Sequence, residues 1–326
     1  MKSTLLKLTI LVVAAIIALS LSRLSFGKES PAEVKPFLPE IVSQFPDVRD
    51  VAISPDQREV YFTIQSYSNE ISAIVFVTRQ KSGYSKPEVA AFSGRFSDME
   101  PVFSADGLKL YFVSNRPLTA GESEAKDYDI WYVERKTITD AWSAPVNMGA
   151  PVNTGDNEFY PSFTRSGNLY FTCDGRGTKG KDDIFLCTFR KGQYLERESL
   201  TDSINSEGME FNAFVAPDES YLVYTCYNRK GDFGSGDLYI SWNKNGVWSK
   251  GKNIGAEYNT KQMEYCPFVD TQNGILYFTS RRNKVNTKFS KQQTLDELLN
   301  EMNRYENGKS RLYQVSSAQL TVRSAQ

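Results

Sequence analysis

A short apolar strand with an aromatic centre recurs along the chain and is the main pattern in the sequence. Each copy follows a turn and ends on a β-branched residue. The five copies are Tyr61-Phe62-Thr63, Tyr111-Phe112-Val113, Tyr170-Phe171-Thr172, Val223-Tyr224-Thr225 and Tyr277-Phe278-Thr279. They are 50, 59, 53 and 54 residues apart. A period in this range is typical of repeat folds in which each unit is one small sheet.

Turn residues precede every copy and predict a β-hairpin at the start of each repeat. The turn signals are Ser54-Pro55-Asp56, Asp106-Gly107, Ser166-Gly167, Pro217-Asp218 and Asn273-Gly274. The third strands are marked by Ala73-Ile74-Val75, Asp129-Ile130-Trp131, Asp183-Ile184-Phe185, Asp237-Leu238-Tyr239 and Arg311-Leu312-Tyr313. An aromatic residue 11 or 13 positions later marks a fourth strand in the first four repeats. Four short antiparallel strands per unit indicate propeller blades.

The ends of the chain predict how the ring closes. The last repeat has no room for a fourth strand before Gln326, whereas residues 35–43 resemble the fourth strand of the first repeat at 86–93. We therefore expect an all-β, five-bladed propeller of four-stranded antiparallel blades, with the N-terminal strand completing the last blade. Such closure leaves no free sheet edge at the seam. The predicted domain is 28–326, with blades at about 45–93, 98–149, 157–203, 209–255 and 263–326 plus 35–43.

One predicted helix interrupts the fifth blade. Thr294 and Glu297 form a capping box at its start. The apolar residues that follow at helical spacing are Leu295, Leu298, Leu299 and Met302. We expect this apolar stripe to pack on the ring. A lid or a partner-docking element is the alternative.

The first 27 residues have the three-part layout of a secretory signal peptide. Lys2 and Lys7 precede an apolar stretch over residues 8–21, and small residues follow it. Because this stretch is shorter than the roughly 20 residues that span a bilayer comfortably, we expect cleavage, after Gly27 in preference to Ser20. The expected location is the periplasm or the outer membrane, and an uncleaved anchor is the alternative. No cysteine lies near the cleavage site, which excludes lipid attachment there.

Composition removes several classes of function. The 326 residues include 38 basic and 39 acidic side chains, a net charge of −1, and no basic run that would bind nucleic-acid phosphates. We therefore expect no nucleic-acid partner. The sequence contains 0 histidines, which excludes Ser-His-Asp and Cys-His catalysis and every zinc site that needs an imidazole. We expect no cofactor.

A glutamate precedes the first strand in four repeats, and an arginine ends the second strand of the same four. These residues are Glu100, Glu158, Glu210 and Glu264 with Arg116, Arg176, Arg229 and Arg282. Because the two strands are antiparallel, we expect these charges to gather on one face of the disc near the central channel. Ion pairs that fix each blade to its neighbour are the expected role, since a residue found in every repeat usually serves the repeat. The alternative is a polar funnel that binds a sugar, a peptide end or a partner loop.

Two further groups have structural interpretations. Asp182-Asp183 and Asp237 follow glycine-rich loops whose spacing fits no calcium-binding pattern, so we expect these aspartates to accept hydrogen bonds from turn amides and predict no metal site. The four cysteines are Cys173, Cys187, Cys226 and Cys266. Export favours disulfides. Cys173 and Cys226, however, align with serines in other repeats and are expected to be small buried residues, and spacing assigns no disulfide.

With these motifs, the chain resembles the TolB-type, WD40-like propeller repeats of exported bacterial envelope proteins, especially those of Bacteroidetes, over residues 35–326. The motifs are the turn followed by Leu-Tyr-Phe, Ser114-Asn115-Arg116, the Asp-Ile-aromatic strand, Trp142-Ser143-Ala144-Pro145 and Asn153-Thr154. The resemblance implies a periplasmic or outer-membrane-associated propeller that serves as an interaction module. The first blade departs from the pattern, because Ala73 replaces the aspartate and no arginine follows Tyr61-Phe62-Thr63.

We expect a monomeric, non-catalytic module that binds an envelope protein or a glycan, with peripheral membrane association. The alternative is a glycosidase, which needs two carboxylates and no histidine. Against it, the acidic residues recur from blade to blade, whereas a catalytic pair must differ from its equivalents in other blades. Ion pairs at all four glutamates would favour the first function. Two unpaired carboxylates beside exposed aromatic residues would favour the second.

Overall fold

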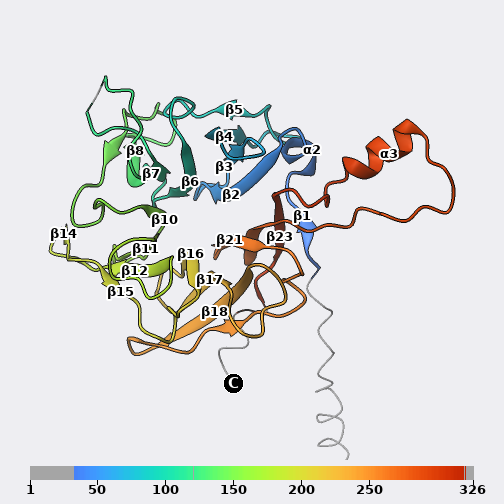
Figure 1. Ribbon diagram of the computed structural model, residues 1–326. Helices are drawn as coiled ribbons and strands as arrows, with labels where there is room; N and C mark the ends of the chain where they lie inside the picture. The colour runs from blue at the N-terminus through green and yellow to red at the C-terminus, as the bar shows by residue number, and fades with distance from the viewer. Residues whose placement is uncertain (1–32, 120, 319, 321–326) are drawn as a thin grey trace, which may run out of the picture. The chain divides into compact units, whose positions relative to one another are not determined.

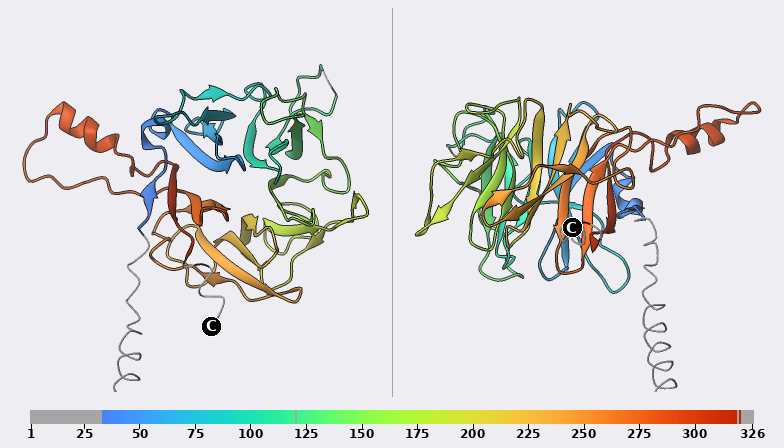
Figure 2. Two further views of the ribbon diagram at one scale, coloured as in Figure 1. Left: turned by 180° about the vertical axis from the view of Figure 1, so that it is seen from behind. Right: turned by 90° about the horizontal axis from the view of Figure 1, so that it is seen from below.

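The computed structural model describes residues 33–119, 121–318 and 320, which belong to one compact unit that begins at Glu33. The described residues form five antiparallel sheets arranged in a ring, with the first strand of each sheet innermost (Figures 1 and 2). The five-bladed, nearly all-β propeller predicted from the sequence is confirmed.

The first four blades share one strand order, from the centre of the ring outward. Blade 1 contains β2 (Asp47–Ile53), β3 (Glu59–Gln65), β4 (Ser72–Thr78) and β5 (Glu88–Val89). Blade 2 contains β6 (Asp98–Phe103), β7 (Lys109–Ser114), β8 (Asp129–Glu134) and β9 (Val146–Asn147). Blade 3 contains β10 (Glu158–Phe163), β11 (Leu169–Cys173), β12 (Asp183–Cys187) and β15 (Glu198–Ser199). Blade 4 contains β16 (Met209–Val215), β17 (Tyr221–Tyr227), β18 (Asp237–Lys244) and β20 (Lys252–Asn253).

Three short strands form hairpins beside this pattern. Strands β13 (Phe189–Arg190) and β14 (Gln193–Tyr194) pair with each other, and β19 (Val247–Trp248) pairs with the end of β18. The aromatic residue that marks the fourth strand in the sequence lies in these hairpins in blades 3 and 4. The true outer strands, β15 and β20, follow a few residues later.

The fifth blade is completed by the N-terminal segment, as predicted. It contains β21 (Glu264–Asp270), β22 (Ile275–Ser280) and β23 (Arg311–Ser316), and β1 (Lys35–Pro36) pairs antiparallel with β23. The segment is less regular than the strand expected over 35–43, because α2 (Pro39–Val42) begins directly after Leu38, whose φ of 50° is left-handed. Proline at the first helical position has no amide to donate to a ladder and suits a helix start.

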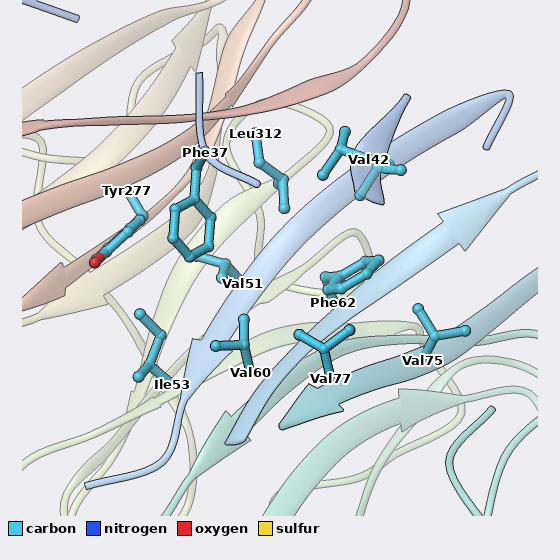
Figure 3. Packing of buried hydrophobic residues seen from close by; sticks show 11 residues of the cluster. Phe37, Val42, Val51, Ile53, Val60, Phe62, Val75, Val77, Tyr277 and Leu312 are labelled. Carbon is cyan, nitrogen blue, oxygen red and sulfur yellow. The ribbon is translucent and has the colours of Figure 1, made fainter. Parts of the chain in front are cut away.

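The seam between blades 5 and 1 is held by an apolar cluster that includes the N-terminal segment (Figure 3). Phe37 and Val42 from this segment pack with Val51 and Phe62 of blade 1 and with Leu312 of blade 5. The Phe37 amide also donates to the Leu312 carbonyl at 2.9 Å. Full burial of each large apolar side chain contributes about 1.5–3 kcal/mol, so the segment is a substantial part of the core.

The recurring aromatic strands form the cores between neighbouring blades. Between blades 1 and 2, Tyr61 and Phe112 share one buried cluster with Trp131. The Trp142 indole donates to the Tyr61 hydroxyl at 3.0 Å. The aromatic residues that recur in the sequence therefore form the packing contacts between neighbouring blades.

Helix α3 (Leu295–Met302) does not pack its apolar stripe on the ring, so that expectation is wrong. The capping box of Thr294 and Glu297 is present, but no residue of the helix is buried. The exposed fractions are 71% for Leu295, 44% for Leu299 and 60% for Met302. Figure 2 shows the helix standing away from the sheets on two long connections between β22 and β23. An amphipathic helix pattern identifies the helix but not its partner.

Within the described part of the chain, no helix has the length and apolar character needed to cross a bilayer. The predicted signal peptide at 1–27 lies outside the described residues.

Candidate functional site

Two of the four predicted ion pairs form as expected. Arg229 donates to Glu210 at 2.9 Å, and an Arg282 nitrogen lies 3.7 Å from a Glu264 oxygen. Each carboxylate also accepts the backbone amide of the residue four positions earlier, Ser206 at 2.6 Å and Thr260 at 2.7 Å. These glutamates therefore tie the second strand to the segment that enters the blade.

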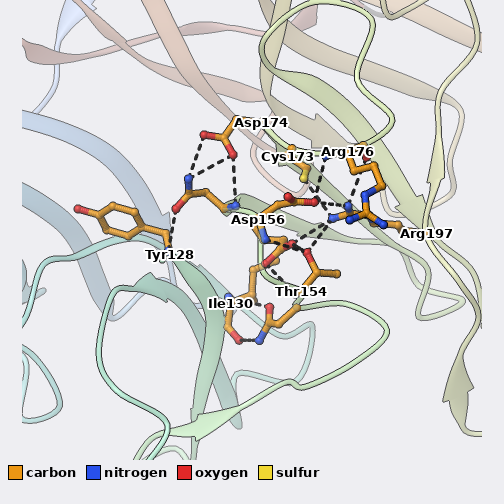
Figure 4. A network of polar contacts seen from close by, with 12 residues as sticks. Tyr128, Ile130, Thr154, Asp156, Cys173, Asp174, Arg176 and Arg197 are labelled. Carbon is orange, nitrogen blue, oxygen red and sulfur yellow. Dashed lines mark hydrogen bonds and ion pairs between the residues drawn. The ribbon is translucent and has the colours of Figure 1, made fainter. Parts of the chain in front are cut away.

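Blade 3 uses a different arginine (Figure 4). Glu158 is paired with Arg197 at 3.1 Å, and Arg197 also donates to Asp156 at 2.6 Å. Arg176, the predicted partner, is exposed and contributes its backbone amide to Asp156 at 3.0 Å. The prediction of a Glu158–Arg176 pair is wrong, because Arg197 reaches the same carboxylate from the start of the outer strand.

In blade 2 the predicted glutamate is the wrong residue. Asp98, not Glu100, is opposite Ser114 in the register that places Glu210 opposite Cys226. Arg116 accordingly pairs with Asp98 at 2.7 Å. The shift by two residues carries Glu100 out of the predicted set of ion pairs.

We call the carboxylate–arginine pairs at Asp98, Glu158, Glu210 and Glu264 the blade clamps. All four carboxylate side chains are fully buried. Three arginines also donate to a carbonyl of the segment between blades: Arg116 to Phe92 at 2.9 Å, Arg229 to Ile204 at 2.7 Å, and Arg282 to Tyr258. The Glu210 amide donates at 2.9 Å to the carbonyl of Asp182, the last residue of the loop between β11 and β12 of blade 3. Burial raises the pKa of Glu158 to about 7 and also raises the pKa of Glu264.

Two of the three predicted loop aspartates, Asp183 and Asp237, have the expected role. Asp183 accepts the Lys179 amide at 2.9 Å, and Asp237 accepts the Phe233 amide at 2.7 Å. All four cysteines are buried free thiols. Cys173 and Cys226 occupy equivalent register positions, opposite Glu158 and Glu210.

The inner strands carry a second set of equivalent positions, which the search for repeated charges does not reveal. Two residues after each clamp position, the strand has a bulge where the register shifts, and the bulged residue has a left-handed backbone. These residues are Asp50, Glu100, Tyr160, Asn212 and Cys266, with φ values of 58°, 58°, 49°, 51° and 51°. A left-handed backbone is uncommon for residues other than glycine. The bulge recurs in every blade, but its side chain is different each time.

Three of these residues bond directly to Arg49 in the middle of the ring, and the other two bond to Glu100. We call the five residues and Arg49 together the central cluster. Arg49 donates to Asp50 at 2.9 Å, to Cys266 Sγ at 3.2 Å, and to Glu100. Glu100 also accepts from Asn212 at 3.1 Å and from the Tyr160 amide at 2.6 Å. The cluster therefore joins all five blades through hydrogen bonds to a few buried groups.

Glu100 has an unusual electrostatic position. Its side chain is 2% exposed, and burial raises its pKa to about 7, an effect that the Arg49 charge opposes and the Asp50 charge increases. Burial likewise raises the pKa of the Cys266 thiol well above its usual value. A thiol of this kind is a poor nucleophile.

The central cluster does not fit a metal ion. Asp50, Glu100 and Cys266 are the one group in the described residues whose potential ligand atoms lie close enough, within 4.8 Å of one another. Arg49 already donates to all three side chains. A bound cation would have to displace this guanidinium and remain beside its charge.

A cavity of about 260 Å³ opens above the central cluster, where the inner strands begin, and we call it the mouth cavity. Its aromatic lining residues are Phe159, Phe211 and Tyr265, and its charged ones are Arg49, Glu100, Asp182 and Arg281. Gln65, Asn69 and Asn212 add amide groups. Of the eight charged residues predicted as a site, Glu100 alone lines this cavity. The others belong to the blade clamps or, for Arg176, to an exposed loop.

The opposite end of the ring has a second cavity of about 320 Å³, lined by the ends of the inner strands and the hairpin turns. Phe103, Phe163 and Phe268 give it a more apolar lining. In every blade, the residue that belongs to the central cluster lies on the inner strand between the part that lines the mouth cavity and the part that lines the second cavity. The two ends of the channel thus present different chemistry.

No protein-family model matches the chain, and no curated protein matches it. Solved structures do match it. TolB from Acinetobacter baumannii is 15% identical with a TM-score of 0.43, over 83% of this chain and 55% of the TolB chain. A GH62 hydrolase in complex with xylotriose is 11% identical with a TM-score of 0.49, over 83% of this chain and 92% of the hydrolase. An alpha-L-arabinofuranosidase from Lactobacillus brevis is 11% identical with a TM-score of 0.44, over 82% of this chain and 90% of its own.

This chain thus spans about half the length of TolB. The propeller implied by the resemblance is confirmed, and at these identities the comparison concerns the fold. The expectation that the protein is not an enzyme is corrected, because the solved propellers that resemble it include hydrolases. The absence of histidine from the sequence excludes reactions that need an imidazole, but glycoside hydrolysis needs only two carboxylates.

Proposed function

We propose that this protein is an exported propeller of the bacterial cell envelope, of the TolB-like repeat type, which binds an oligosaccharide in the mouth cavity. Export and the repeat type rest on the signal-peptide pattern and the motifs in the sequence. Oligosaccharide binding rests on the lining of the mouth cavity.

The observation that carries the proposal is where the repeat is broken. Four of the five blades share a buried carboxylate paired with an arginine, whereas the residues at the mouth differ in all five. At the position before the bulge, the five blades have Arg49, Met99, Phe159, Phe211 and Tyr265. Residues that serve the repeat should be alike, whereas residues that recognise an asymmetric ligand must differ.

The kind of lining favours a sugar. Phe159 and Phe211 are partly exposed and offer apolar ring faces, while Gln65, Asn69 and Asn212 offer both hydrogen-bond donors and acceptors. Sugars present apolar faces and a rim of hydroxyl groups, and concave sites combine apolar walls with a few polar groups. A flat, hydrophobic protein interface would not need this density of amides and charges.

Binding of an oligosaccharide panel to the full chain tests the proposal. We expect Phe211→Ala to weaken binding by roughly tenfold or more, since loss of an aromatic contact of about 1.5 kcal/mol corresponds to that factor. Phe189→Ala, in the β13–β14 hairpin away from the mouth cavity, is the matched control and should bind like the unmodified protein. If no oligosaccharide binds, or if the two variants behave alike, the proposal is wrong.

A second candidate, glycosidic bond hydrolysis, is favoured by one observation. Asp50 and Glu100 are neighbouring carboxyl groups that break the repeat, and Glu100, with a pKa raised to about 7, has the character of a general acid. Binding ranks first because both carboxylates are bonded to Arg49 and Asp50 does not line the mouth cavity. Release of reducing ends from polysaccharides, abolished by Glu100→Gln, would establish hydrolysis.

A further inference from the structure

Arg281 lines the mouth cavity, and its position is fixed by Ser310 of the same blade. Its Nε donates to the Ser310 hydroxyl at 3.1 Å. The same hydroxyl accepts from the Tyr265 hydroxyl at 2.8 Å, and Ser310 is itself held by its amide, which donates to Asp47 at 2.7 Å. Ser310 is 1% exposed. A rigid, buried serine therefore orients an exposed guanidinium beside an aromatic ring.

The outer edge of this guanidinium is available for a ligand. Among the described residues, none accepts a hydrogen bond or forms an ion pair with Nη1 or Nη2 of Arg281. The clamp arginines differ in this respect. A terminal nitrogen of Arg116, of Arg197 and of Arg229 forms an ion pair with a buried carboxylate. Two parallel N–H groups on one guanidinium match the two oxygens of a carboxylate.

The mouth cavity is electrically polarised across the ring. Arg49 lies over the Tyr265 ring at 5.3 Å from its centroid, and the Arg49 and Arg281 charges both act on Tyr265, whose pKa burial raises to about 12. The two cations thus flank the seam between blades 5 and 1. Asp182, an acidic residue of the cavity lining, comes from the connection between β11 and β12 of blade 3. Arg49 is largely neutralised by Asp50 and Glu100, so Arg281 is the cation left for a ligand.

Arg281 also breaks the repeat. Arg281 follows Ser280, which is opposite Glu264 in the strand register. At the equivalent position the other four blades have Gln65, Asn115, Asp174 and Tyr227. The clamp arginine of blade 5 is the next residue, Arg282. The blade therefore has an additional arginine that the clamp does not use.

From these contacts we infer that the oligosaccharide is acidic, with a uronic acid unit whose carboxylate binds the terminal nitrogens of Arg281 while its ring lies against the aromatic lining. This inference rests on the proposed function and names the ligand class for the same cavity. On the side of the cavity opposite Arg281, the Asp182 carboxylate can accept hydrogen bonds from sugar hydroxyl groups.

Calorimetric titration of the full chain with a galacturonic acid trimer and with a neutral galactose trimer tests the inference. We expect the acidic trimer to bind at least about tenfold more tightly, since a hydrogen bond to a charged group contributes about 1.5 kcal/mol or more. Arg281→Gln should remove this preference and leave binding of the neutral trimer unchanged. Arg281→Lys should retain only part of it, because an ammonium keeps the charge without the paired donors. Arg190→Gln, on the exposed β13–β14 hairpin, is the matched control.

The outcomes separate the two proposals. Equal affinities for the two trimers, or a preference that survives in Arg281→Gln, would overturn the acidic-sugar inference and leave oligosaccharide binding standing. Failure to bind any sugar would overturn both. Binding of a peptide through its free C-terminus, lost on amidation and in Arg281→Gln, would assign the carboxylate to a peptide and also overturn the inference. An unchanged melting temperature in each variant shows that the fold is intact.

Discussion

On strand β16, Glu210 and Asn212 are two residues apart and belong to different regions of the molecule. Glu210 is part of a blade clamp whose counterparts in other blades are acidic residues paired with arginine. Asn212 belongs to the central cluster, in which its counterparts are Asp50, Glu100, Tyr160 and Cys266. The clamp recurs in four blades because it makes the same kind of connection in each of them. The central positions vary because together they form one site.

The same contrast explains the error at Glu100. Spacing along the sequence placed it among the clamp glutamates, but register places Asp98 in the clamp and Glu100 in the central cluster. In blade 2 the two regions both carry an acidic residue. Identity of residue type is therefore a weaker guide than its position in the strand.

The largest expected effect comes from breaking a clamp. Glu210→Ala should lower the free energy of unfolding by about 3 kcal/mol or more, because it leaves Arg229 without its buried partner. Urea denaturation measures this loss. Asp202→Ala, which removes an exposed partner of Lys179, should leave the free energy of unfolding nearly unchanged and serves as the control. Equal losses in the two variants would contradict the distinction between clamp and surface pairs.

The next test asks which arginine completes the clamp of blade 3. Arg197→Ala should cost about 2–3 kcal/mol, because Glu158 remains buried without its ion pair. Arg176→Ala should stay within about 0.5 kcal/mol, because its exposed side chain has no part in the clamp. Thermal unfolding of the two variants side by side decides the matter. A larger loss in Arg176→Ala would restore the pairing predicted from the sequence.

Titration of Glu100 in the central cluster should make the free energy of unfolding depend on pH. Glu100 has a folded-state pKa near 7, above its ordinary value, so the folded protein binds more protons than the unfolded chain between about pH 4.5 and pH 7. Stability linked to this group is present at low pH and falls as pH rises through that window, by at most about 1.4 kcal/mol per pH unit. Glu100→Gln lacks the titration, so the stability difference between it and the unmodified protein should change across the window. Parallel curves from pH 5 to pH 8 would exclude a raised pKa at Glu100.

The smallest effect is expected outside both regions. Leu299→Glu on α3 should change the unfolding free energy by no more than about 0.5 kcal/mol, since the side chain is 44% exposed and no residue of the helix is buried. A urea titration is sufficient to measure it. A loss above about 2 kcal/mol would mean that the helix packs on the ring in solution.

Much of the fold could be predicted because its pattern is local and repeated. The aromatic strands such as Tyr170-Phe171-Thr172 and the turns before them fix strand number, and the deficit at the last blade identifies the closing segment. The cap and the apolar stripe are enough to predict the helix at 295–302. They do not predict its failure to pack, because a stripe reports amphipathic character and not the surface that covers it.

The site is far less predictable, for a physical reason. The search for repeated charges finds residues such as Glu264 and Arg282, which form the clamp of blade 5 and have counterparts in three other blades. Residues that line the mouth cavity, such as Arg49 and Arg281, have no repeat to reveal them. The bulge that brings Cys266 beside Arg49 depends on backbone register. A signal is present in the chain, since the residue two positions after each clamp acid changes from blade to blade. Comparing the repeats for their differences would find the inner-strand positions.

The pairing of β1 with β23 has a consequence for biosynthesis. Lys35 is opposite Gln314, so the two partners are separated by nearly the entire polypeptide. A ribosome releases the first partner long before the second exists, and contacts between such distant segments form slowly. During that interval Phe37 lacks the Tyr277 and Leu312 side chains of blade 5 that pack against it in the folded protein, so the nascent chain keeps apolar surface exposed until its last strand is made.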